Sequence, residues 1–160
     1  MKIGLALEEL HRAENDLAQE LLQVSERHKA DHEIYHLGRD LAGWSHRHIR
    51  EIAEVGRNYG LDLDPEPESE SAWAERIREK GSELLGRRSH AALLLLRDLR
   101  EIYMKAAGVS ADWDLLGQAA QGIKHTDLLE VATRCHPDTL RQMHWAHAKL
   151  KEEATQILVS

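Results

Sequence analysis

Hydrophobic residues recur in the N-terminal segment at alternating intervals of four and three residues. This spacing places them on one side of an α-helix and predicts a helix over about residues 3–28. Two positions in the series, Glu14 and His28, carry ionisable side chains where an apolar residue is expected. The full series is Ile3, Leu7, Leu10, Glu14, Leu17, Leu21, Val24 and His28.

A second series with the same spacing predicts a helix that ends at Gly60, with Asp31 as its N-cap. Its members are Ile34, Leu37, Leu41, Ser45, His48, Ile52, Val55 and Tyr59. Because only a short turn separates the two helices, we expect an antiparallel hairpin, in which the numbers of facing residues sum to roughly 60. Glu14 should therefore lie level with Ser45 and His48.

An acidic connection follows at about residues 61–70. Its prolines, Pro65 and Pro67, block a helix, and its like charges favour an extended chain. Ten extended residues can reach roughly 30 Å, which is enough to cross the length of a helical bundle. We expect one domain over residues 1–160 that contains this connection.

The second half of the chain also follows a helical period. We expect a third helix that ends at Gly108, short connector helices capped by Ser110 and Thr126, and a final helix from Pro137 to about Leu158. The third series is Trp73, Ile77, Leu84, Arg88, Ala92, Leu95, Leu99, Ile102 and Ala106, with an interruption near Gly81 or Gly86. The sequence thus predicts an all-α four-helix bundle, with short connector helices between the third and last long helices.

The composition and charge of the chain argue against several classes of function. The formal charge of −7 argues against general affinity for nucleic acid or acidic membranes, and no apolar run approaches a membrane span. The N-terminal residues lack a signal-peptide pattern, so we expect a cytoplasmic protein. The single Cys135 is expected to be a small buried apolar residue. We recognise no nucleophilic triad, phosphate loop or dinucleotide fingerprint, and no reaction is assigned.

One zinc-protease motif occurs in the predicted second helix. Residues 32–36 read HEIYH and match HExxH, in which two imidazoles bind zinc and the glutamate is a general base. At about 100° per residue, however, His32 and His36 point roughly 160° away from Ile34 and the apolar face. No third ligand pattern follows. We therefore interpret the motif as a solvated helix face.

Polar residues at inward-facing helix positions are better evidence for a functional site than the HExxH motif is. Glu14 and His48 occupy apolar positions, and His11 lies one turn before Glu14. On the last helix His147 belongs to the predicted buried stripe, and His144 lies at its edge. Buried ionisable groups need partners or a metal, so we predict one polar layer that binds iron or zinc. If no metal is bound, Arg88 is the expected counter-charge, and the same layer is a structural ion-pair network.

This arrangement resembles the ferritin-like carboxylate proteins, whose bundles carry inward Glu and Glu-x-x-His side chains and a long crossover. By that resemblance Glu14 matches the first-helix Glu, His48 the second-helix His and His147 the fourth-helix His. Ser45 and His144 stand where the family has Glu, and the third helix lacks its Glu. The resemblance implies the bundle layout and, at three positions, metal ligation.

Two function classes remain. The first is a metal-binding ferritin-like bundle that holds iron or zinc through Glu14, His48 and His147, with His11 and His144 at the margin. The second is a non-catalytic bundle that associates with itself or with another protein. It is suggested by residues 91–96, AALLLL, which are apolar around the whole helix. We expect a homo-oligomer that buries Leu93 and Leu94.

Overall fold

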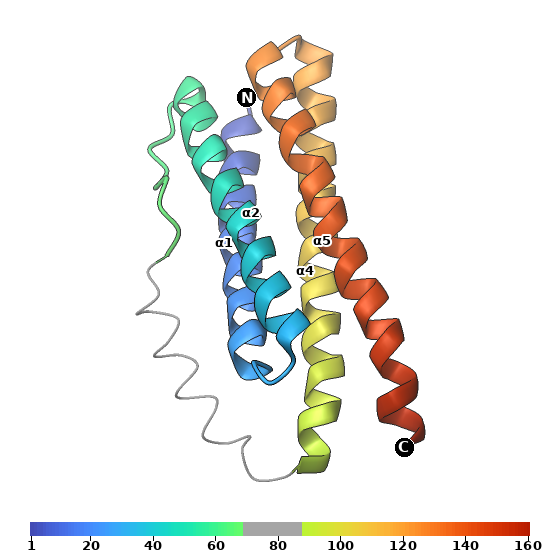
Figure 1. Ribbon diagram of the computed structural model, residues 1–160. Helices are drawn as coiled ribbons and strands as arrows, with labels where there is room; N and C mark the ends of the chain where they lie inside the picture. The colour runs from blue at the N-terminus through green and yellow to red at the C-terminus, as the bar shows by residue number, and fades with distance from the viewer. Residues whose placement is uncertain (69–87) are drawn as a thin grey trace.

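The computed structural model describes residues 1–68 and 88–160, and these residues form helices, turns and one extended connection, with no strand (Figure 1). The helices are α1 (Ile3–Arg27), α2 (His32–Gly56), α4 (Arg88–Ile123) and α5 (Thr126–Val159), and a short 3₁₀ helix, η1 (Arg57–Tyr59), extends α2. The all-α prediction is confirmed for these residues. The predicted positions Trp73, Ile77, Gly81, Leu84 and Gly86 lie outside them.

The first hairpin agrees closely with the sequence. A carboxylate oxygen of Asp31 accepts a hydrogen bond from the backbone N–H of Ile34 at 3.1 Å, which caps α2. Gly60 ends η1 with φ of 75°, a left-handed conformation that favours glycine. Gly38 lets the helices approach closely, because a Cβ atom there would lie 3.1 Å from Cβ of Ser25.

The connection after α2 is extended through residue 68, as predicted, and follows α1. The ring of His11 hydrogen-bonds the carbonyl oxygen of Asp64 at 2.8 Å, and the amide oxygen of Asn15 accepts from the backbone N–H of Glu68 at 3.3 Å. Figure 1 shows this segment (green) returning along the outside of the first hairpin. It runs toward the end of the bundle at which α4 begins.

The predicted end of the third helix at Gly108 is wrong, since α4 continues through Gly108 and Ser110 to Ile123. Its buried side chains keep the helical spacing across that point: Leu99, Ile102, Ala106, Val109, Trp113, Leu116 and Ala120. Burying this continuous stripe outweighs the weak helix propensity of one glycine, which costs about 1 kcal/mol relative to alanine. Ser110 is therefore an interior residue of α4 and caps no connector helix.

The predicted connector helix at Thr126 and the helix start at Pro137 are also wrong. Helix α5 begins at Thr126 and contains Pro137 in its interior. Proline removes one helical hydrogen bond, but α5 packs against α4 on both sides of it, from Leu128 to Ala146. This long antiparallel pair is the most extensively packed among the described helices, and its packing holds the helix together through the proline.

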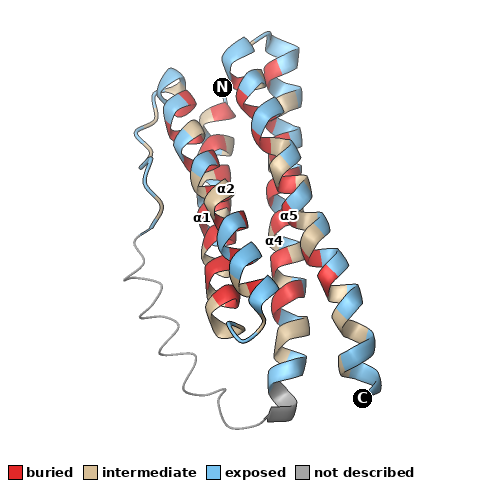
Figure 2. Cartoon of the chain, in the orientation of Figure 1, coloured by how far each residue is buried: buried red, intermediate tan, exposed pale blue. Residues whose placement is uncertain are grey.

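The four long helices form a ring in the order α1, α2, α5, α4, in which each neighbouring pair is antiparallel. The pairs α1–α2 and α4–α5 pack extensively, and α2–α5 is the least extensive of the four. Figure 2 shows the buried residues facing the interior of this ring and the exposed ones facing outward. No helix in the described residues is long and apolar enough to cross a membrane.

Candidate functional site

Glu14 and His48 meet in the core, as the hairpin register predicts. Atom Nδ1 of His48 lies 2.9 Å from Oε1 of Glu14, and the two residues are only 2% and 0% exposed. Their helices place them there because both side chains replace apolar residues on the inward faces of α1 and α2. The central pair of the predicted polar layer is confirmed.

Two further members of this cluster come from the second hairpin. The indole Nε1–H of Trp113 on α4 donates to Oε1 of Glu14 at 3.0 Å. On α5, Oδ2 of Asp138 lies 3.2 Å from Nε2 of His48. Arg141 and Arg47 contact Asp138 from outside, at 2.9 Å and 3.8 Å.

Neither member was predicted from the sequence, because the predicted connector helix after Ser110 contains Trp113 and the predicted helix start at Pro137 is next to Asp138. Treating the two helices as continuous through Gly108 and Pro137 would have identified Trp113 and Asp138 from the sequence. The side chain of Arg88, the counter-charge that we expected, lies outside the described side chains.

The arrangement around His48 fits an imidazolium ion. Each ring nitrogen faces a carboxylate, and a neutral imidazole can donate to only one of them. Burial by itself lowers the pKa of His48, but the hydrogen bonds and negative charges of Glu14 and Asp138 outweigh it. The pKa of His48 therefore lies above its ordinary value of 6.5. We call the residues Glu14, His48, Trp113 and Asp138 the buried cluster.

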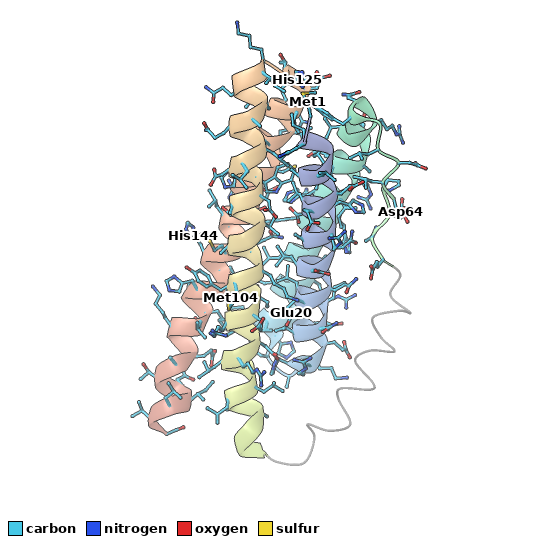
Figure 3. The ribbon with its side chains drawn as sticks, turned by 180° about the vertical axis from the view of Figure 1, so that it is seen from behind. Met1, Glu20, Asp64, Met104, His125 and His144 are labelled. Carbon is cyan, nitrogen blue, oxygen red and sulfur yellow. The ribbon has the colours of Figure 1, made fainter. Side chains whose placement is uncertain are left out.

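The other three predicted members of the layer lie elsewhere. The prediction that His144 and His147 face inward is wrong, since both are exposed on α5 and the ring of His147 packs against Tyr103 at 5.0 Å between centroids. Figure 3 shows His144 on the outside of α5. His11 is half-buried and contacts the connection at Asp64. Packing of the long α4–α5 pair turns both α5 histidines outward.

The donor set does not converge on one point in the way that a metal ion requires. Glu14 and Asp138 lie on opposite nitrogens of the same ring, and a metal needs several lone pairs directed at one position. Among the described side chains, no group of three or more His, Cys, Asp or Glu residues is arranged to hold a metal ion. Within the buried cluster itself, Oε2 of Glu14 is buried without a hydrogen-bond partner.

Polar contacts continue along the α2–α5 seam on both sides of His48. The amide Nε2 of Gln142 donates to the hydroxyl of Ser45 at 2.9 Å, one turn from the ring. Lys149, only 5% exposed, donates to Glu33 at 2.9 Å, and carboxylate bonds raise its pKa against the lowering effect of burial. Polar side chains therefore connect α2 and α5, the least extensively packed of the four neighbouring pairs of long helices.

Cys135 belongs to the same seam. Its Sγ–H donates to Oε2 of Glu51 at 2.8 Å, and Arg134 bonds the other oxygen of that carboxylate at 2.9 Å. Burial and the nearby Glu51 raise the pKa of the Cys135 thiol far above its usual range. Cys135 is 1% exposed, as expected for a structural residue, and is held as the unreactive thiol.

A serine, a histidine and an aspartate also come together between α4 and α5. Oγ of Ser110 lies 2.8 Å from Nε2 of His136, and Nδ1 of His136 lies 3.6 Å from Oδ1 of Asp114. Ser110 is 7% exposed, however, and does not line the neighbouring pocket of about 300 Å³, whose walls include Gly117 and Pro137. The backbone N–H groups around Ser110 are used within α4, so they are not free to stabilise an oxyanion. The three residues link the two helices.

The HExxH histidines are exposed, as the helical phase predicts. His32 and His36 lie on the solvent face of α2, with their rings stacked 6.4 Å apart, whereas Ile34 between them is fully buried. Their exposure confirms the interpretation of this segment as a solvated helix face.

An apolar groove of about 620 Å³ lies between the start of α1 and the end of α4. Ile3 and Ala6 form one wall, Leu115 and Ala119 the other, and Met1 and Ile123 lie at its open end. Leu115 is 68% exposed and Ile123 43%. We call this feature the α1–α4 groove; Figure 3 shows Met1 beside the end of α4.

No protein-family model matches this chain, and neither the curated proteins nor the solved structures contain one with significant similarity to it.

Proposed function

We propose that this protein is a non-catalytic helical bundle that acts by associating with another protein surface through the α1–α4 groove and the adjacent outer face of α4. The observation that carries the proposal is the exposure of large apolar side chains on that face. Leu93, Met104 and Leu115 are 52%, 50% and 68% exposed, and Leu115 also lines the groove. The contiguous apolar surface is the lining of the groove, which includes Ile3, Leu115 and Ile123, and apolar surface of this kind is typical of interaction sites.

The buried cluster supports this function by fixing the bundle. Its hydrogen bonds connect the four long helices that the structure describes at one level: Glu14 from α1, His48 from α2, Trp113 from α4 and Asp138 from α5. Buried polar networks of this type favour one helix arrangement over others of similar packing. A rigid bundle can present the apolar face without rearranging.

Photo-crosslinking tests the proposal. Leu115 is replaced by a photoreactive amino acid, and the full-length protein is irradiated in the cells that produce it and after purification. We expect covalent products heavier than one chain. The same replacement at Lys151, exposed on α5, is the control and should give none. If position 115 gives no heavier product in either setting, the apolar face is not an interaction surface.

Metal binding is a second candidate, favoured by the unpartnered Oε2 of Glu14 next to His48. Binding there would require the His48 ring to release one of its two carboxylates. A ferritin-like role would depend on such a site. Elemental analysis of purified protein, with melting measured after addition of iron or zinc, tests it. Less than a tenth of an equivalent of any transition metal, together with unchanged melting, would exclude this candidate.

A further inference from the structure

The outer face of α4 carries one continuous line of exposed positions. Leu93, Met104 and Leu115 are spaced by eleven residues, which take an α-helix through about three full turns plus 20°, so they lie almost on one line. The other positions on this line, between these residues and beyond Leu115, are also exposed: Arg97, Arg100, Gly108, Ala111, Gln118 and Gly122. We call these nine positions the α4 stripe. Figure 3 looks onto α4, with α1 on one side of it and α5 on the other.

Six positions of the α4 stripe form three pairs that are symmetric about the midpoint between Val109 and Ser110. Gly108 and Ala111 lie equally far from that point, Met104 and Leu115 form the next pair, and Arg97 and Gly122 lie further out. A twofold axis through an interface pairs each residue with a second one in both directions. We infer that a second copy of this chain packs α4 antiparallel on α4, with Met104 of each copy against Leu115 of the other. This inference rests on the proposed function and names its partner.

The side chains suit such a crossing. Two of the three small residues of the α4 stripe, Gly108 and Ala111, are next to the midpoint, where two helix backbones approach most closely. A Cβ atom at Gly108 would meet nothing within 4 Å in its own chain, so the space outside it is open to a partner. One turn further out on each side, Met104 and Leu115 supply the large apolar side chains that would fill the space beside the crossing.

Charges agree with the same pairing. The α1 side of α4 is marked by Lys105, which bonds Glu20 of α1 at 3.2 Å, and Glu101 lies one turn earlier on that side. A twofold axis perpendicular to both helices brings the α1 sides of the two copies together. Glu101 would then lie within one residue of the level of Ala119 of the second copy, which lines the α1–α4 groove together with the positively charged Lys2.

The available area requires that the groove take part. Residues 93–122 span about 45 Å of helix, and a helix is about 10 Å wide, so the α4 stripe offers roughly 450 Å² per copy. A stable dimer buries about 800 Å² per partner. The groove beside the stripe supplies further apolar area on the side where the two α1 helices would meet. We therefore expect a dimer that dissociates in the micromolar range rather than an obligate one.

Charge substitution tests both the partner and the register. Met104→Lys and Leu115→Glu each place one charge against an apolar side chain, and each should weaken self-association about tenfold or more. In the double variant every lysine faces a glutamate of the other copy, so the dissociation constant should return to within a few fold of the original value. High salt screens these charge pairs and should reduce this recovery. Light scattering and sedimentation across micromolar to submillimolar protein concentrations measure the self-association of each variant. Leu158→Glu, 64% exposed near the end of α5, is the matched control and should change nothing.

Each alternative result has a defined meaning. An original chain that stays monomeric at every concentration overturns the inference, and so does a double variant that associates no better than the single ones. If the chain is monomeric and Leu115→Glu lowers its melting temperature, its own residues cover the stripe. Heavier photo-crosslinks at position 115 that do not have the mass of two chains would overturn the dimer and leave the proposed function standing.

Discussion

Replacing Glu14 by leucine should destabilise the fold severely. Oε1 of Glu14 accepts hydrogen bonds from Nδ1 of His48 and Nε1 of Trp113, and these two residues are 2% and 1% exposed. Glu14→Leu leaves both donors buried without this acceptor and removes one of the two carboxylates that balance the imidazolium. Breaking a buried ionic pair on one side typically costs about 3–5 kcal/mol.

The unpartnered Oε2 of Glu14 already carries a desolvation cost in the original protein, which places the expected loss toward the lower end of that range. For a chain of this length, about 2–4 °C of melting temperature is lost per kcal/mol, so we expect a decrease of roughly 6–15 °C. Glu14→Gln keeps one acceptor oxygen, removes the charge and replaces the unpartnered Oε2 by an amide NH2 group. It should cost less, about 1–3 kcal/mol.

Urea unfolding followed by circular dichroism at neutral pH measures these losses. The matched control is Glu9→Leu on the same helix, because the Glu9–Arg12 pair is 68% and 66% exposed. Surface pairs of this kind contribute at most about 1 kcal/mol. If Glu14→Leu costs no more than Glu9→Leu, the buried cluster does not stabilise the bundle, and the reasoning from burial and hydrogen bonding is refuted.

Three further predictions concern the same helices. The stabilisation by His48 is the difference in unfolding free energy between the original protein and His48→Gln. This difference should be full below about pH 6.5 and decline as the pH rises through the folded-state pKa of His48, which is higher than 6.5. A difference that grows with pH would contradict the assignment of His48 as an imidazolium ion. His32→Ala with His36→Ala should change the unfolding free energy by less than about 0.5 kcal/mol, and a larger loss in urea unfolding would show that the exposed pair has a structural role. Lys149→Met should cost about 1.5–3 kcal/mol, since a buried ammonium group bonded to carboxylates is lost, and thermal unfolding that shows no loss would count against a structural α2–α5 seam.

The sequence by itself determined the first hairpin and its register. Apolar spacing, the Asp31 cap and Gly60 are local signals, and a short turn leaves two helices few ways to pair. For this reason the contact between Glu14 and His48 could be predicted before the structure. The extended course of residues 61–68 was also readable, because proline and like charge act within a few residues.

Only the tertiary structure decided the course of α4 and α5 and, through it, the composition of the buried cluster. Gly108 and Pro137 are local helix-breaking signals, but packing along the α4–α5 pair outweighs them. The rotation of a long helix about its axis depends on everything packed against it, and the phase of α5 directs Asp138 to His48 and leaves His147 exposed. Such non-local packing contributes more free energy than a single glycine or proline removes, which is why sequence periodicity alone could not assign the second half of the site.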